Sequence, residues 1–275
     1  MVGELAARHV AYVQLDEGLL DHAVWRGGHR VAAPRAVAQD ELDVLAGDVA
    51  VIRLQLPANQ NLQYRAGQYV EFILRDGARR SYSMANAPHT LPGQIELHIR
   101  HMPGGKFTDH VFGALKEKDI LRMEGPFGSF FLREDSDKPI VLLASGTGFA
   151  PIKAILEHLQ FKAITRPAVL YWGCRSKADL YLHDWAVEAA AQMPNLSYVP
   201  VLSAAKPEDG WTGRTGLVHQ AVMHDHPNLM EWQVYACGAP IMVESAKHDF
   251  VLKCGLPDDE FYADAFTSEA DKHGG

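Results

Sequence analysis

The hydrophobic pattern of this chain changes in character about halfway along its length. Over residues 49–57, 68–74 and 95–100, apolar and polar side chains alternate, and turn residues punctuate these segments. Alternation is typical of strands with one buried face. Short strands with frequent turns predict a small antiparallel barrel. One helix, over about residues 108–116 with Thr108 as its N-cap, is expected to interrupt the barrel.

The second half contains continuous apolar runs instead, as expected for strands covered on both faces. Helical stretches separate the runs, including residues 241–253, which Gly255 would close as a C′ residue. This alternation predicts a doubly wound parallel sheet. The runs are residues 140–144, 168–172, 198–202 and 233–236.

With 275 residues, the chain is long enough for two domains. We expect a barrel domain over residues 33–135 and an α/β domain over 136–275. Residues 1–32 carry few signals and are expected to be a short appended segment, while residues 268–275 are expected to be a frayed tail.

Composition excludes several classes of protein. A net charge of −8 argues against a nucleic-acid partner, which normally meets a basic excess. No apolar run approaches the roughly 20 residues of a membrane span, so no membrane partner is expected. The N-terminus lacks the basic and apolar blocks of a signal peptide, and a cytoplasmic location is expected.

Metal chemistry is also not expected. Cys174, Cys237 and Cys254 are widely spaced, whereas a plant-type 2Fe–2S cluster needs four thiolates, three of them close together. The spacing equally argues against a disulfide framework. The histidines do not converge clearly either, and structural or solvent roles are expected for the two groups His98 and His101, and His219, His224 and His226.

Residues 146–151, Gly-Thr-Gly-Phe-Ala-Pro, follow an apolar strand and open a helix. Free backbone N–H groups and the positive helix end make such a turn a binding site for pyrophosphate. Gly146 and Gly148 would let the backbone approach the phosphates, Thr147 offers a hydroxyl, and Pro151 lies in the first helical turn. A plain tight turn is the alternative, but the order of strand, motif and helix favours the site.

Residues 80–86 have the form R-x-Y-S-x-x-N. Strand alternation places Arg80 and Tyr82 on one face and Ser83 on the other, so a local bend is expected if both faces are to meet one ligand. Downstream, the glycine loop at residues 103–108 opens the predicted helix and forms a second candidate anion site, with a hairpin turn as the alternative. Two phosphate turns on two domains indicate two ligands or one long ligand.

From about Pro34 onward, these motifs resemble the ferredoxin–NADP⁺ reductase superfamily. Within it, the chain is most similar to reductase components of bacterial oxygenases and to CDP-6-deoxyhexose (glucoseen) reductases. The resemblance implies an antiparallel β-barrel FAD domain followed by a doubly wound parallel-sheet NAD(P) domain. Residues 124–128 match the family's G-P-x-G turn at the domain junction.

The resemblance also implies roles for individual residues on the flavin side. Arg80 would bind the flavin phosphate, Tyr82 would pack on the isoalloxazine, and Ser83 would approach N5. The remaining contacts to FAD would come from two short segments, namely His98, Ile99 and Arg100, and Gly105, Lys106, Phe107 and Thr108.

On the nucleotide side, residues 235–240 match the family element Y-x-C-G-x-P. It would place Cys237 and Gly238 beside the nicotinamide, although a free cysteine is often only a small buried apolar residue. Phe266, in the closing segment 261–266, would cover the other face of the flavin. Ser83, Cys237 and Phe266 are therefore the candidate catalytic residues. Arg175 is a candidate for the nucleotide ribose, and the Asp179–Leu180 pair resembles the branch that uses NADH rather than NADPH.

The reaction implied is hydride transfer from NADH to FAD, followed by electron transfer to a separate acceptor. The close relatives usually carry a ferredoxin-like domain before the flavin domain, where this chain has about 32 residues without cysteine. The acceptor is therefore left open between a ferredoxin or Rieske protein, a haem protein, free flavin and a dye. Two other readings are a reductase that uses free flavin as substrate and a flavin-binding regulatory module, although the intact R-x-Y-S-x-x-N segment argues against the module.

Overall fold

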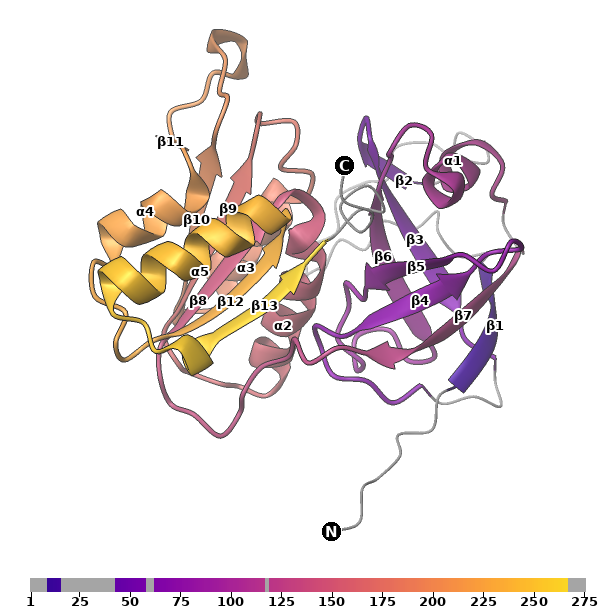
Figure 1. The fold of residues 1–275 in the computed structure, drawn as a ribbon, viewed down its shortest axis with the longest axis horizontal. Coiled ribbons are helices and arrows are strands. Elements are labelled where there is room, and N and C mark those ends of the chain that lie inside the picture. The colour runs from indigo at the N-terminus through magenta and orange to yellow at the C-terminus, as the bar shows by residue number, and fades with distance from the viewer. Residues whose placement is uncertain (1–8, 16–42, 58–61, 117–118, 267–275) are drawn as a thin grey trace, which may run out of the picture.

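The computed structural model describes residues 9–15, 43–57, 62–116 and 119–266, and it divides them between two sheets that lie side by side (Figure 1). The first sheet is antiparallel and the second is parallel. The predicted fold class is confirmed. In the described part of the chain, no helix combines the length and apolar character needed to cross a bilayer.

The first sheet closes into a barrel. Its strands follow the order β2-β3-β1-β7-β4-β5, and β6 pairs with β3. An isolated bridge between Met84 and Leu97 joins β5 to β6, and apolar side chains from the inner face fill the interior. The strands are β1 (His9–Leu15), β2 (Asp43–Ala46), β3 (Val49–Gln55), β4 (Tyr69–Ile73), β5 (Arg79–Ser83), β6 (Gln94–Arg100) and β7 (Ile120–Phe127).

Strand β1 was not found from the sequence. It lies within residues 1–32, which were expected to be an appended segment, yet it pairs with β3 and with β7 inside the barrel sheet. Its partner Gly125 lies over a hundred positions further along, opposite His9, so no local signal reveals the pairing. The rest of residues 1–32, and the tail 268–275, lie outside the described residues.

Helix α1 (Lys106–Gly113) covers one end of the barrel, with Phe107 and Val111 in the core. The prediction of Thr108 as its N-cap was wrong, because the helix begins two residues earlier and Gly105 is the cap. The Thr108 hydroxyl instead donates to the Met102 carbonyl oxygen at 2.8 Å.

The second sheet is six-stranded and parallel, in the order β11-β10-β9-β8-β12-β13. Helices α2 and α3 pack on one face, and α4 and α5 pack on the other. Gly255, with φ of +70°, ends α5 as predicted. The elements are β8 (Ile140–Ser145), α2 (Phe149–Phe161), β9 (Ala168–Cys174), α3 (His183–Gln192), β10 (Leu196–Leu202), β11 (Arg214–Thr215), α4 (Val218–Asp225), β12 (Gln233–Gly238), α5 (Pro240–Cys254) and β13 (Phe261–Ala265).

Candidate functional site

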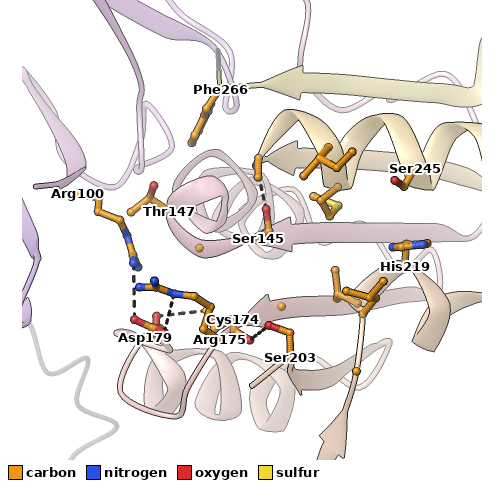
Figure 2. A pocket seen from close by; sticks show the side chains of 18 residues that line it. Arg100, Ser145, Thr147, Cys174, Arg175, Asp179, Ser203, His219, Ser245 and Phe266 are labelled. Atoms are coloured by element: carbon orange, nitrogen blue, oxygen red, sulfur yellow. Dashed lines mark hydrogen bonds and ion pairs between the residues drawn. The ribbon is translucent and has the colours of Figure 1, made fainter. Parts of the chain in front are cut away.

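A cavity of about 430 Å³ lies at the carboxyl edge of the parallel sheet, on the side that faces the barrel (Figure 2). Ligands of open α/β sheets bind at this edge. Five residues predicted from the sequence line it, together with residues from β9, α4 and α5. These five are Arg100, Gly146, Thr147, Arg175 and Phe266.

The turn after β8 has the predicted form. Residues 146–148 make a single 3₁₀ turn that leads into α2, and Gly146 has φ of +53°. A Cβ on Gly148 would lie 2.2 Å from the carbonyl oxygen of Cys237, so only glycine lets the turn pack against the end of β12. Pro151 lies buried in the first turn of α2. The first N–H groups of α2 precede its internal hydrogen bonds and are directed to the side where an anion would bind.

Arg100 enters the cavity from the barrel, at the end of β6. Its Nη1 donates to Asp48 Oδ2 at 3.1 Å and lies 3.6 Å from Asp179 Oδ1 of the other domain. Its Nη2 is buried and has no hydrogen-bond partner among the described residues. A buried donor without a partner is rare in folded proteins and suits an anionic ligand. The Arg100 side chain, which was expected at FAD, therefore faces the nucleotide cavity.

Arg175 and Asp179 line the next part of the cavity. Arg175 is largely exposed, and its Nε lies 3.7 Å from Asp179 Oδ2. Burial alone would raise the pKa of Asp179, but hydrogen bonds from the Ser176 N–H and hydroxyl, and the nearby arginines, lower it overall. Asp179 is therefore a carboxylate at neutral pH and partly neutralises both arginines.

Strand β5 carries the R-x-Y-S-x-x-N segment along an open edge. It pairs with β4 over its length, while among the described residues its other edge meets β6 only through the Met84 bridge. Tyr82 rests on Phe72 and Phe107, with ring centroids 6.0 and 5.2 Å away. Strand β5 runs without interruption through Tyr82 and Ser83, so the structure shows no bend between these two residues.

The other residues expected at FAD lie in three different settings. The side chains of Ile99 and Phe107 are in the barrel core, so only their backbone is available to a ligand. His98 is buried between the domains, against Glu96 and Tyr181. The Arg80 guanidinium donates to the carbonyl oxygen of its neighbour Arg79 at 2.8 Å.

The loop before α1 does fit a phosphate. The first internal bond of α1 runs from Asp109 N to Gly105 O at 2.8 Å, so the N–H groups of residues 106–108 precede it. A Cβ on Gly105 would lie 2.6 Å from Thr108 Oγ1, which keeps this cradle free of side chains. Lys106 is exposed and pairs with Asp76. Each domain thus has one turn whose free N–H groups and glycines suit a phosphate.

Two of the candidate catalytic residues meet at a residue that the sequence analysis did not single out. The Ser83 hydroxyl donates to Asp264 Oδ2 at 3.0 Å, and Cys237 Sγ lies 4.0 Å from the same oxygen. Burial raises the pKa of Asp264, which the Ser83 hydrogen bond only partly offsets. Burial also raises the pKa of Cys237 well above that of a free thiol, so Cys237 is a neutral thiol. In the sequence, the only indication of a role for Asp264 is its place within the closing segment 261–266.

The closing strand also sets the position of Phe266. Its backbone N–H donates to the Gly238 carbonyl oxygen at 2.9 Å, and its ring points into the cavity from the end of β13 (Figure 2). Gly238 has φ of +132°, and a Cβ there would lie 2.3 Å from Ser145 Oγ. Gly238 thus permits the close contact between β12 and β8 below this ring.

Comparisons with known proteins agree with this geometry. Residues 38–132 match the oxidoreductase FAD-binding domain, and residues 142–248 match the oxidoreductase NAD-binding domain. The chain is 46% identical over 228 residues to a CDP-6-deoxy-L-threo-D-glycero-4-hexulose-3-dehydrase reductase of Yersinia pestis, covering 83% of this chain and 67% of the relative. This chain belongs to the ferredoxin reductase-like family of FAD- and NAD-binding oxidoreductases.

Further relatives support the same assignment. The reductase is 38% identical over 230 residues to reductase component 2 of terephthalate 1,2-dioxygenase from Comamonas, covering 83% of this chain and 67% of that one. The solved Amycolatopsis cytochrome P450 reductase GcoB is 31% identical and superposes with a TM-score of 0.76, covering 95% and 71% of the two chains. The chain thus spans about two thirds of the length of these relatives.

The resemblance inferred from the motifs is therefore confirmed, as are FAD and a nicotinamide nucleotide as its cofactors. The chain is an NAD(P)H-dependent flavoprotein reductase. The roles of individual side chains are predictions, and the structure gives the position of each of these residues.

Proposed function

We propose that this reductase oxidises NADH at a bound FAD and passes the electrons to a separate acceptor protein. The Ser83–Asp264 hydrogen bond carries the proposal, because it joins the flavin strand β5 to the closing strand of the nucleotide domain. The two predicted ring sites therefore meet at one place. Hydride transfer requires such proximity, since the reacting atoms must approach to about 3–3.5 Å.

When bound, FAD would supply the redox chemistry, taking a hydride (two electrons and one proton) from the reduced nicotinamide and releasing the electrons singly to an acceptor. The protein itself binds and orients the two ligands and excludes water from them. The turn at Gly146–Gly148 and the unpaired Nη2 of Arg100 would hold the nucleotide pyrophosphate. Tyr82 would support the flavin ring, with its own ring held by Phe72 and Phe107.

Asp264 would fix the rotamer of the Ser83 hydroxyl. Because the hydroxyl proton is donated to the carboxylate, Ser83 Oγ would accept a hydrogen bond only from an N–H group, which N5 of the flavin carries in its reduced form. Cys237 is a neutral, fully buried thiol and would act by packing below the nicotinamide rather than as a nucleophile.

NADH is the proposed donor rather than NADPH. A 2′-phosphate needs uncompensated positive charge, but Arg175 and Arg100 both lie within 4 Å of the Asp179 carboxylate. That carboxylate would repel a phosphate and can accept a hydrogen bond from a ribose hydroxyl. The expected cytoplasmic location is consistent with a reductase that uses NADH.

The proposed acceptor is an iron–sulfur protein of the ferredoxin or Rieske type. The Yersinia and Comamonas relatives are named as reductases of a dehydrase and of a dioxygenase, and the Amycolatopsis relative as a cytochrome P450 reductase. Each name pairs the reductase with another protein. A haem protein is therefore the second class of acceptor to test.

An anaerobic titration of the purified protein with NADH, and separately with NADPH, tests the proposal. We expect stoichiometric FAD that survives gel filtration and bleaches faster with NADH. Loss of the flavin on gel filtration, with activity restored by free flavin, would indicate a flavin reductase. A colourless protein that cannot be reconstituted with FAD would overturn the proposal. Reoxidation of the bleached protein by a purified ferredoxin would then identify the acceptor class.

A further inference from the structure

Helix α2 carries a buried charge into the barrel domain. Lys153 lies one turn after the phosphate-binding turn and is only 7% exposed. Its Nζ lies 3.2 Å from Glu96 Oε1 on β6, and it donates to the carbonyl oxygen of Ala85 at 3.1 Å. Ala85 belongs to the R-x-Y-S-x-x-N segment. One side chain therefore joins helix α2 to two parts of the barrel, strand β6 and the residues that follow β5.

Glu157 adds a second link from the same helix. Its Oε1 accepts from Lys153 Nζ at 2.6 Å, and its Oε2 accepts the backbone N–H of Ala87 at 2.7 Å. The backbone at residues 85–87 is thus held by α2 through a carbonyl oxygen and an N–H group. Figure 1 shows α2 on the side of the α/β domain that faces the barrel.

The charges in this cluster balance. Glu96 also accepts from Arg53 Nε at 3.0 Å, so two cations meet two carboxylates. Burial would raise the pKa of Glu96, but Lys153, His98 and Arg53 lower it overall. Burial would lower the pKa of Lys153, but Glu96 and Glu157 raise it overall. Glu96 and Lys153 are therefore both charged at neutral pH.

His98 completes the cluster as a neutral ring. Burial lowers its pKa below the ordinary value, despite Glu96 beside it. Its Nε2 lies 3.2 Å from Glu96 Oε1 and its Nδ1 lies 2.9 Å from the Tyr181 hydroxyl. Because Glu96 can only accept, Nε2 carries the proton and Nδ1 accepts from Tyr181. Tyr181 belongs to the α/β domain, so His98 is a further bridge.

A buried ion pair is a poor source of stability, since desolvation offsets much of the attraction. What it does provide is a defined geometry, because charged hydrogen bonds are directional and a displaced partner leaves a buried charge. The flavin strand and the nucleotide turn lie in different domains, and the distance between their ligands depends on how those domains are held.

We propose that Lys153, supported by Glu157, is a positioning residue for hydride transfer: it holds the phosphate-binding end of α2 against residues 85–87 and 96, so that the nicotinamide meets the flavin at reacting distance. This inference rests on the proposed function and assigns the interdomain geometry to a particular ion cluster. Loss of the link leaves each ligand's own contacts in place and separates the two rings.

The test uses the FAD-loaded protein and the double substitution K153M/E157Q. This pair removes one cation and one anion, so the Arg53–Glu96 pair is left balanced. The matched control is K247M, which removes an exposed lysine of α5 that pairs with Asp258. Stopped-flow reduction by NADH separates the limiting rate from the apparent affinity.

We expect the limiting rate of flavin bleaching to fall by about tenfold or more, since small displacements of reacting groups cost large factors in rate. The long-wavelength absorbance of the stacked nicotinamide and flavin should weaken, while the apparent Kd for NADH changes by less than about threefold, since the phosphate contacts remain. K247M should match the wild-type protein.

A readout independent of catalysis comes from amide hydrogen exchange without nucleotide. The Ala87 N–H should exchange at least about tenfold faster in K153M/E157Q, because it loses its ionised acceptor. If the double variant does not retain FAD, the single variant E157Q is tested instead. The two measurements are again the exchange of the Ala87 N–H and the limiting rate of flavin bleaching.

The outcomes separate the two proposals. A wild-type protein that NADH does not bleach contradicts the proposed function itself. A wild-type protein that bleaches, together with a FAD-loaded variant that keeps the wild-type rate and Ala87 exchange, overturns the role of Lys153. A limiting rate in K153R close to that of the wild-type protein would support a positioning role over simple packing, because arginine keeps the charge.

Discussion

The Ser83 hydroxyl and the Asp264 carboxylate, 181 residues apart in the chain, are joined by a hydrogen bond of 3.0 Å. One belongs to an antiparallel strand of the barrel and the other to the edge strand of the parallel sheet. In the proposed function, their contact marks where the flavin and the nicotinamide would meet. It also makes Asp264 a residue whose removal affects stability and function in opposite directions.

Substitution of Asp264 by Asn should slow flavin reduction by about tenfold, since an amide holds the Ser83 hydroxyl less firmly than a carboxylate. Ser83→Ala should have a similar effect, and the two should not be additive because they disturb one contact. Stopped-flow reduction by NADH measures both. The exposed Asp258→Asn is the control, and additive losses would show that the two residues act separately.

The difference in stability between D264N and the wild-type protein should depend on pH in a defined direction. Burial raises the folded-state pKa of Asp264, so its contribution to stability is full below the unfolded pKa of about 3.9 and is lost as the pH rises through the folded value. Asn does not titrate. At pH 7, the melting temperature of D264N should therefore be about 2 °C higher than that of the wild-type protein. This difference in melting temperature should shrink towards pH 4. Thermal unfolding over this range measures it, and an advantage that grows on acidification would contradict it.

Gly148→Ala should damage the nucleotide turn. The added Cβ would meet the Cys237 carbonyl group at 2.2 Å, and relief requires backbone movement at both β12 and α2. We expect a loss of about 2 kcal/mol in the free energy of unfolding and much weaker NADH binding. Chemical denaturation and nucleotide titration measure the two effects. Gly113→Ala, where a Cβ meets nothing within 4 Å, should be neutral, and equal behaviour of the two variants would contradict the prediction.

Removal of the Phe266 ring should relax nucleotide selectivity. The ring lines the cavity and lies above Arg100 and Thr147 in the view of Figure 2, where we expect the nicotinamide to enter. In Phe266→Ala, and in a truncation after Asp264, the ratio of kcat/KM for NADPH to that for NADH should rise about fivefold, because the ring no longer competes with the nicotinamide. Unchanged steady-state kinetics in both variants would remove Phe266 from the site.

The three cysteines should resist alkylation in the folded protein. Cys174, Cys237 and Cys254 are all buried, and burial raises each pKa, to about 12 for Cys174. The reactive thiolate is therefore scarce at pH 8. Mass spectrometry after iodoacetamide should show little labelling in buffer and complete labelling in denaturant. Rapid labelling of Cys237 in buffer would contradict a neutral packing role.

Much of the architecture follows from short-range patterns in the sequence. Alternating side chains predicted β3, β4 and β6, and continuous apolar runs predicted β8, β9, β10 and β12. The reason is that the burial of one or both faces of a strand determines the pattern of its apolar residues. The turn at Gly146–Gly148 was equally visible, since its glycines, the strand before it and the helix after it are consecutive. The fold class and the two cofactors followed from these segments together with the resemblance that they carry.

What the tertiary structure alone decided is how distant segments meet. Strand β1 pairs with partners far along the chain, Asp264 reaches Ser83 from the other domain, and Arg100 turns from the flavin segment into the nucleotide cavity. Lys153, which no sequence motif singles out, is buried against Glu96. The physical reason is common to all four. A strand partner or a buried charge is chosen by three-dimensional packing, in which residues from both domains share one desolvated space, and no local period of the sequence records that choice.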